Sequence, residues 1–301
     1  MTSKKESRVR PRAVDGSDGG MWRRYSTAED NARTNRHYDL PAEFITTITG
    51  GDWRVYSCNL WEGAASVTES QERKLDLLAD LLQLQPGQRV LDVGCGWGGP
   101  LIYLAQRYGV KGVGLTLSPT QKDYADHWIK ERGVDVAVHV CHWRDFEDTD
   151  RFDAAYTDEV IVHFNDLLGF FQQVKKLLKP DGRMLNKEVH FTSTHFMQPT
   201  RTMIFVNEVF GETGNYLLLA EELALLDQAG FRIEQIQQMS VQNYVTTLDG
   251  WFTNMQAHRQ ELETLVGNDV YQRFRIYLRI ARQNFRGPSK TLDMVVARPL
   301  A

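Results

Sequence analysis

The amino-acid sequence predicts an α/β fold: a doubly wound, mostly parallel sheet with helical insertions before it and over it. Three observations carry this prediction. Strand-like and helix-like segments alternate between residues 89 and 189, which favours a parallel sheet covered on both faces. Residues 90–99 combine a buried strand with a glycine turn that opens a helix. The chain has 301 residues, 42% of them hydrophobic and 25% charged, so it can bury one sizeable core and we expect a single domain.

The expected strands and helices follow one another in a regular order. The strands span residues 89–93, 110–115, 134–140, 152–156 and 183–189, and a final strand spans 292–297. The helices between them span residues 100–108, 119–132 and 166–178. Ser118 is the expected N-cap of the second helix. The Lys-Pro-Asp-Gly sequence at 179–182 predicts the turn into the fifth strand.

The segments outside this alternation differ in composition. Residues 1–20 carry several basic side chains among Ser, Gly and Pro and almost nothing apolar, which predicts a flexible basic arm. Residues 21–80 read as a mostly helical cap, and residues 190–285 as a helical insertion rich in aromatic side chains. We assign residues 21–301 to one domain, with a ligand-binding core at 81–190 and a final strand at 290–298.

Composition limits the classes of partner and location. A net charge of −4 gives no electrostatic case for nucleic acid. No apolar run approaches the roughly 20 residues that cross a bilayer, and the first residues lack the apolar region of a secretory signal. The three cysteines, Cys58, Cys95 and Cys141, lie far apart, which predicts neither a disulfide framework nor a metal site. We therefore expect a cytoplasmic protein, with peripheral membrane contact through the basic arm left open.

The glycine turn marks the expected ligand site. In Gly94-Cys95-Gly96 and the two glycines that follow at 98 and 99, the missing Cβ atoms let a ligand approach the backbone at the carboxyl end of the first strand. The spacing departs from the Gly-x-Gly-x-x-Gly pattern that binds a pyrophosphate. A purely structural strand-to-helix turn is the alternative.

The next two strand ends supply further polar and aromatic side chains. The second strand ends without the acidic residue that binds a ribose in many such folds, and Thr116 and Gln121 offer hydrogen bonds instead. His142 and Trp143 follow the third strand. An aromatic side chain at this place can cover an adenine, although Trp143 would equally suit the protein core.

The motif Leu-Asp-Val-Gly-Cys-Gly at 91–96 resembles the first motif of S-adenosylmethionine-dependent methyltransferases. Other motifs resemble the cyclopropane fatty-acid synthase and mycolic-acid methyltransferase family within that class. They are His37-Tyr38-Asp39, Tyr56-Ser57-Cys58, residues 114–121 and Tyr277-Leu278, extended by residues 71–75, 242–244 and 271–278. The resemblance covers residues 35–298.

This resemblance implies a Rossmann-like class I methyltransferase with S-adenosyl-L-methionine as its cofactor. The residues implied for the cofactor site are Tyr56, Ser57, Gly94, Cys95, Gly96, Thr116, Leu117, Gln121, His142 and Trp143. The insertion at 190–285 would build the acceptor pocket, and its Phe, Met and Ile side chains favour a hydrophobic small molecule or a lipid. The oligomeric state is not predicted.

In ring-forming members of the family, the resemblance implies a bound bicarbonate as the base, held by a Cys, a Glu, a His and a Tyr. Cys58 and Tyr244 match this set. Val162 stands where the family has the Glu, and Lys187 aligns with the His. Ala281 replaces a further cysteine. These departures remove polar partners of a bicarbonate.

Another group must then serve as the base. Asp158 and Glu159 directly follow the fourth strand and face the expected transfer site, where a desolvated carboxylate can act as a general base. A solvated strand end is the alternative. His163 is a second acid–base candidate, and His190 or His195 could replace the family histidine. The expected catalytic residues are Glu159, His163, Cys58 and Tyr244.

Three functions follow from these residues. The first is methylation or cyclopropanation of an apolar acceptor, most simply the alkene of an unsaturated acyl chain. The second is C- or N-methylation of a small molecule in specialised metabolism, such as an isoprenoid or an amine, which needs no bicarbonate. The third is a non-catalytic module that keeps the fold as an interaction scaffold, which the intact glycine turn disfavours.

Overall fold

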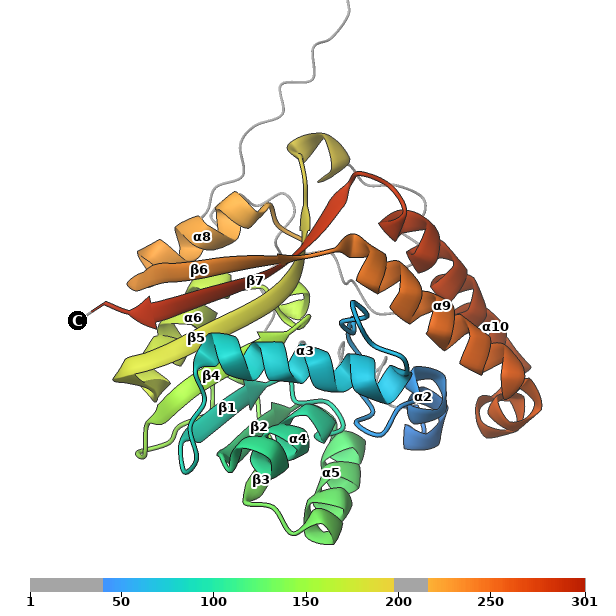
Figure 1. The fold of residues 1–301 in the computed structure, drawn as a ribbon, viewed down its shortest axis with the longest axis horizontal. Coiled ribbons are helices and arrows are strands. Elements are labelled where there is room, and N and C mark those ends of the chain that lie inside the picture. The colour runs from blue at the N-terminus through green and yellow to red at the C-terminus, as the bar shows by residue number, and fades with distance from the viewer. Residues whose placement is uncertain (1–39, 198–215, 301) are drawn as a thin grey trace, which may run out of the picture.

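The computed structural model describes residues 40–197 and 216–300, which form one seven-stranded sheet with helices on both faces (Figure 1). The strand order is β3-β2-β1-β4-β5-β7-β6, with β1 to β5 parallel and β7 antiparallel to both of its neighbours. The strands are β1 Arg89–Val93, β2 Lys111–Thr116, β3 Val136–Val140, β4 Phe152–Asp158, β5 Leu178–Phe191, β6 Phe231–Met239 and β7 Lys290–Pro299. The predicted doubly wound, mostly parallel sheet is confirmed.

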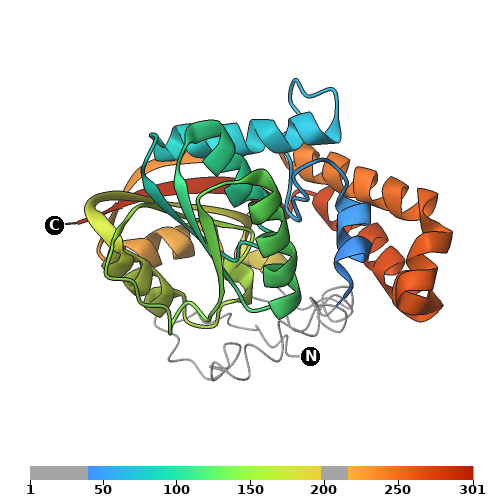
Figure 2. The same ribbon diagram turned by 90° about the horizontal axis from the view of Figure 1, so that it is seen from below.

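The helices pack in two layers against the sheet, with a helical hairpin beside it (Figure 2). They are α2 Ala42–Thr49, α3 Val67–Leu82, α4 Gly99–Tyr108, α5 Pro119–Arg132, α6 Leu167–Leu177, α8 Leu219–Gln228, α9 Val241–Ala257 and α10 Arg259–Phe285. Apolar side chains of α3 and α4 form one core with one face of the sheet, and those of α6 and α8 form a second core with the other face. No helix within 40–197 or 216–300 is long and apolar enough to span a bilayer.

The predicted elements of the core are present, with shifted ends. Ser118 caps α5 by accepting a hydrogen bond from the Gln121 backbone N–H at 3.3 Å. The predicted turn at 179–182 lies within β5 as a bulge, because Phe152 pairs with Leu178 and Ala154 already pairs with Arg183. The strand β4 continues two residues beyond its predicted end, to Asp158, so the carboxylates that follow Tyr156 belong to the sheet edge.

The prediction for residues 190–285 was wrong over β6. This segment is a strand at the edge of the sheet, paired with β7. Its long polar side chains are largely exposed. Only Phe231 and Ile233 keep the alternation of apolar and polar residues that predicts a strand, so the pattern is too short to be recognised in the sequence.

Of the predicted helical cap at 21–80, the described residues contain α2 and α3, which are separated by an irregular loop at 50–66. The basic arm at 1–20, the His37-Tyr38-Asp39 motif and residues 198–215 of the insertion lie outside the described residues.

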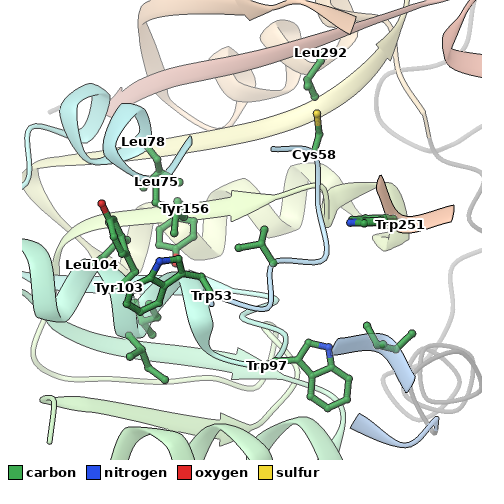
Figure 3. Packing of buried hydrophobic residues seen from close by; sticks show 14 of the residues in the cluster. Trp53, Cys58, Leu75, Leu78, Trp97, Tyr103, Leu104, Tyr156, Trp251 and Leu292 are labelled. Atoms are coloured by element: carbon green, nitrogen blue, oxygen red, sulfur yellow. The ribbon is translucent and has the colours of Figure 1, made fainter. Parts of the chain in front are cut away.

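The loop at 50–66 crosses the carboxyl edge of the sheet and docks against the glycine turn. Trp53 packs edge-on against Tyr103 of α4, with ring centroids 4.8 Å apart (Figure 3). A Cβ on Gly99 would lie 1.7 Å from the Trp53 carbonyl oxygen, so the loop can sit this close only where a glycine begins α4. This docking holds residues 54–58 over the ends of β1 and β4.

Candidate active site

A pocket opens at the carboxyl ends of β1, β2 and β4, where open α/β sheets bind their ligands. It is lined by the glycine turn, the strand ends that follow it and the loop at 54–57. The lining includes every residue assigned above to the cofactor: Tyr56, Ser57, Gly94, Cys95, Gly96, Thr116, Leu117, Gln121, His142 and Trp143. Of the expected catalytic residues, Glu159 and His163 also line it.

The glycines of the turn are needed for two different reasons. Gly94 has φ +89°, and a Cβ there would lie 2.6 Å from the Val160 side chain. Gly96 has φ +53°, and a Cβ there would meet no protein atom within 4 Å. Substitution at Gly94 would therefore collide with protein, whereas a side chain at Gly96 would enter the space of the pocket itself.

The end of β2 is arranged by short hydrogen bonds. The Thr116 hydroxyl donates to Gln121 Oε1 at 2.6 Å and accepts from the Ser118 backbone N–H at 3.1 Å. Trp143 is 6% exposed and packs against Phe164 and Phe170. The indole thus belongs to the second core and lines the pocket at the same time, so the two interpretations of Trp143 are compatible.

Asp158 lies at the centre of a buried ionic network. Its Oδ1 accepts from Lys187 Nζ at 2.8 Å, and its Oδ2 accepts from Lys74 Nζ at 2.5 Å and from the Ser57 hydroxyl at 2.7 Å. Burial raises the pKa of the Asp158 carboxyl, but Lys187 and Lys74 outweigh this effect and hold the pKa well below its usual range. Asp158 therefore has a low affinity for a proton and is poorly suited to act as the base.

The Glu159 carboxylate is held by three donors beside the pocket. Its Oε1 accepts from the Cys58 backbone N–H at 2.9 Å and contacts Lys187 Nζ, and its Oε2 accepts from the Tyr244 hydroxyl at 2.5 Å. Tyr244 in turn stacks on Phe285, with ring centroids 3.7 Å apart. The structure thus brings Cys58 and Tyr244 to Glu159 rather than into the pocket lining.

Glu159 also has an unusual backbone. Its φ of +60° lies in the left-handed region, which a residue with a Cβ adopts at a cost of about 1 kcal/mol. A hydrogen bond of 2.8 Å from its N–H to the Lys187 carbonyl holds this conformation. The strained residue directs its carboxylate toward the pocket wall, and this kind of strain concentrates at functional sites.

The Cys58 thiol is buried and hydrogen-bonded, and this disfavours its thiolate form. Burial raises the pKa of the thiol well above its usual range, so it stays protonated, and its Sγ donates to the Asn59 carbonyl at 3.3 Å. What Cys58 contributes is its backbone N–H, which binds Glu159.

The alternative histidines do not replace Lys187. His190 lies on the opposite face of β5, where its ring contacts Glu222 at 2.6 Å and Asp293 at 3.0 Å. His195 is exposed after the end of that strand. Neither side chain reaches Glu159, and Lys187 itself does.

Two functional side chains were missed in the sequence. Lys187 cannot pair with the neighbouring Glu188, because successive side chains of a strand point to opposite faces, and it reaches Asp158 and Glu159 instead. Lys74 was not singled out, although a signal was present: it occupies the buried stripe of α3 beside Leu75, Leu78 and Leu82. A charged residue at a core position of an amphipathic helix is unusual.

Asp92, next to the glycine turn, should make the stability of the fold depend on pH. It accepts a 2.6 Å hydrogen bond from the Tyr156 hydroxyl, and burial raises its pKa from 3.8 to about 7. The folded state then binds a proton that the unfolded chain releases, so this contribution to stability is lost as pH rises from about 4 to 7. Asp92→Asn cannot ionise. The melting temperature of this variant relative to that of wild type should therefore increase from pH 5 to pH 8.

Calorimetric scans at pH 5, 6.5 and 8 measure that difference. Exposed Asp181→Asn is the control and should follow wild type at each pH. A difference between Asp92→Asn and wild type that does not change with pH would contradict the assignment.

The residues of the pocket fit S-adenosylmethionine. The hydroxyls of Ser57 and Thr116 and the ionic network suit the ammonium and carboxylate of an amino acid, and the Trp143 indole suits a purine. The open space at Gly96 is a cradle that a Cβ would fill. Among the described residues, no cluster of His, Cys, Asp and Glu side chains is arranged to bind a metal ion.

The model of the mycolic acid cyclopropane synthetase family matches residues 25–295 of this chain. The methyltransferase UmaA of Mycobacterium tuberculosis is 29% identical over 265 residues, which cover 83% of this chain and 91% of UmaA. Cyclopropane mycolic acid synthase 1 of the same organism is 30% identical over 276 residues, covering 85% of this chain and 92% of that protein.

A comparison with solved structures points to the same family. The mycolic acid cyclopropane synthase CmaA1, complexed with SAH and CTAB, superposes with a TM-score of 0.82 at 27% identity, covering 89% of this chain and 98% of that one. The predicted fold class, enzyme class and cofactor are confirmed. The chain belongs to the mycolic acid cyclopropane synthetase family, and it is an S-adenosylmethionine-dependent methyltransferase.

Proposed function

We propose that this enzyme methylates or cyclopropanates the alkene of an unsaturated acyl chain, with Glu159 as its built-in base. The observation that carries the proposal is the Glu159 carboxylate, fixed at the pocket by Lys187, Tyr244 and the Cys58 N–H. The relatives named for cyclopropane synthesis support the acyl acceptor.

The charges of the site suit an internal base. Two ammonium groups, of Lys74 and Lys187, face two carboxylates, of Asp158 and Glu159, in one buried network. The positive and negative charges of the network are equal in number without an added anion. A bicarbonate would need a further cationic partner in this low-dielectric surrounding, so the chain's own carboxylate takes over the role that a bound anion would have.

Glu159 has two tasks in this reaction, to stabilise a positive charge and to take up a proton. When bound, S-adenosylmethionine supplies an electrophilic methyl group. Once an alkene carbon carries that methyl group, the neighbouring carbon is electron-deficient and the anionic Glu159 stabilises it. If a methyl C–H bond then breaks, its electrons close the ring and the proton passes to the carboxylate. If a C–H bond of the acyl carbon next to the cation breaks instead, its electrons form a new alkene, the proton passes to the same carboxylate and the methyl group stays intact. Tyr244 and Lys187 hold the carboxylate in place for either outcome.

Isotope labelling tests the proposal. The protein is incubated with methyl-deuterated S-adenosylmethionine and three acceptors: an unsaturated phospholipid, a prenyl diphosphate and a hydrophobic amine. We expect an acyl product. It retains two deuterium atoms if the ring closes, and three if a methyl group is transferred intact. A labelled prenyl or amine product without an acyl product would replace the proposal with small-molecule methylation, and no product on any of the three acceptors would contradict the proposed acyl acceptor.

We also propose that the enzyme works in the cytoplasm and reaches lipid acceptors by peripheral contact. The three cysteines are free thiols in the structure, which suits a reducing compartment. The basic residues 1–20 have the charge to bind an anionic membrane. Sedimentation with vesicles of anionic and neutral lipid, with and without residues 1–20, tests this contact.

A further inference from the structure

Lys74 is a buried cation that the site as described so far does not explain. It comes from α3 and does not line the pocket, and its side chain is 0% exposed. Its Nζ donates to Ser57 Oγ at 2.7 Å and to Asp158 Oδ2 at 2.5 Å. Both acceptors line the pocket, so Lys74 lies directly behind the wall that the ligand meets.

Packing alone gives no reason for a lysine at this position. The other side chains of the same buried stripe include Leu75, Leu78 and Leu82, and an aliphatic residue would avoid the cost of burying a charge. That burial lowers the pKa of Lys74, and Asp158 opposes the shift. A buried ion pair rarely gains stability over an apolar replacement, so the lysine points to a role beyond stability.

The ammonium also fixes the direction of the Ser57 hydroxyl. The Lys74 ammonium, paired with Asp158, can only donate. Ser57 Oγ therefore accepts from it, and the Ser57 proton goes to Asp158 Oδ2 at 2.7 Å. With its one proton committed, Ser57 Oγ can bind a ligand only as an acceptor. A hydrogen bond between this oxygen and a bound molecule must then come from an N–H or O–H of that molecule.

We infer that Lys74 is a positioning residue of the cofactor site, acting through Ser57 and Asp158. It orients the Ser57 hydroxyl toward Asp158 and shares the charge of Asp158 with Lys187, which leaves Lys187 to hold Glu159 as well. The inference rests on the proposed role of Ser57 in binding the cofactor.

Binding of S-adenosylhomocysteine by calorimetry tests the inference without turnover. Lys74→Met keeps an unbranched side chain that is one atom shorter, and it removes the ammonium. We expect the Kd to rise about tenfold or more, the effect of losing a charge-assisted hydrogen bond. In turnover assays, KM for the methyl donor should rise by a larger factor than kcat falls.

Gln71→Met is the matched control. Gln71 lies one turn earlier on the same buried face of α3, and it binds the Trp53 N–H at 3.1 Å and the Gly50 carbonyl at 3.0 Å. The substitution loosens the same loop without touching Ser57 or Asp158. Because the same loop carries Ser57, we expect a lower melting temperature and a rise in Kd that stays below the tenfold step expected for Lys74→Met.

Two further measurements distinguish a positioning role of Lys74 from a role in the stability of the fold alone. If Lys74 acts through Ser57, the losses of Lys74→Met and Ser57→Ala in binding free energy do not add in the double variant. Without Lys74, only Lys187 remains to pair with Asp158, so the pKa of the Asp158 carboxyl rises. The Kd for S-adenosylhomocysteine should then begin to weaken at a higher pH than in wild type as the solution is made more acidic. Lys74→Gln, which keeps one donor, takes the place of Lys74→Met in these measurements if the methionine variant does not fold.

The outcomes are distinct. A folded variant that binds S-adenosylhomocysteine as wild type does, or no worse than Gln71→Met, overturns the inference, and so do additive losses. If wild type binds the ligand but yields no acyl product, the proposed acceptor fails and the result for Lys74 still stands.

Discussion

Glu159→Gln should lower kcat by about 10²–10⁴-fold, the usual contribution of a positioned general base. The amide keeps the shape of the side chain and can still accept from the Cys58 N–H, but it carries no negative charge and takes up no proton. The Kd for S-adenosylhomocysteine should stay within about twofold, because no charge-assisted bond to the ligand is removed. Steady-state kinetics and calorimetry measure the two quantities.

The product distribution of Glu159→Gln distinguishes two roles of the carboxylate. If Glu159 removes the proton that closes a ring, the variant accumulates uncyclised methylated product, in which water has added to the cation or the cation has lost a proton from another carbon. If it only stabilises the cation, all products fall together. Retention of wild-type turnover would show that the base lies elsewhere.

Glu188→Gln is the matched control for this experiment. Glu188 is also buried, but it follows Lys187 on the opposite face of β5, where its Oε1 accepts from the Val189 N–H. Turnover of this variant should match that of wild type. A comparable loss in both variants would indicate a general effect of neutralising a buried carboxyl group.

Gly96→Val should abolish cofactor binding while the chain still folds. The space beside Gly96 is free of protein atoms within 4 Å and belongs to the pocket. A valine side chain would fill the volume that the ligand needs, so we expect a loss in affinity of about 100-fold or more, corresponding to roughly 3 kcal/mol. Calorimetry with S-adenosylhomocysteine measures it.

Strain from the left-handed backbone must be separated from this steric effect. Gly133, the C-cap of α5, has φ +63° and likewise meets no atom within 4 Å of a built Cβ, but it lies outside the pocket. Gly133→Val should therefore lower the melting temperature by a similar amount and leave the Kd unchanged. If Gly96→Val binds as tightly as Gly133→Val, the turn does not contact the cofactor.

Much of the cofactor pocket could be predicted because its residues stand in short, local motifs. A strand, a glycine turn and a helix are adjacent in the chain, and parallel strands bring their carboxyl ends to one edge. Thr116 ends β2, and Gly96 and Trp143 lie three residues after the ends of β1 and β3, so the order of elements was enough to place them together.

The transfer site could not be predicted in the same way. Its partners are far apart in sequence: Ser57 and Asp158 are separated by 101 residues, and Lys187 reaches Glu159 only through the register of β4 and β5. A change of one residue in that register would turn Lys187 to the opposite face. The sequence showed Lys187 as a departure from the family and gave no sign of its partners.

By itself, then, the sequence determined the α/β class, the family, the cofactor and the strand ends that line the pocket, since local periodicity and short motifs encode these. Tertiary structure alone decided that Asp158 is neutralised by Lys74 and Lys187, that Glu159 is held by Tyr244 and the Cys58 N–H, and that His190 lies on the far face. The physical reason is that a buried charge is defined by its partners, and strand register and helix packing choose those partners.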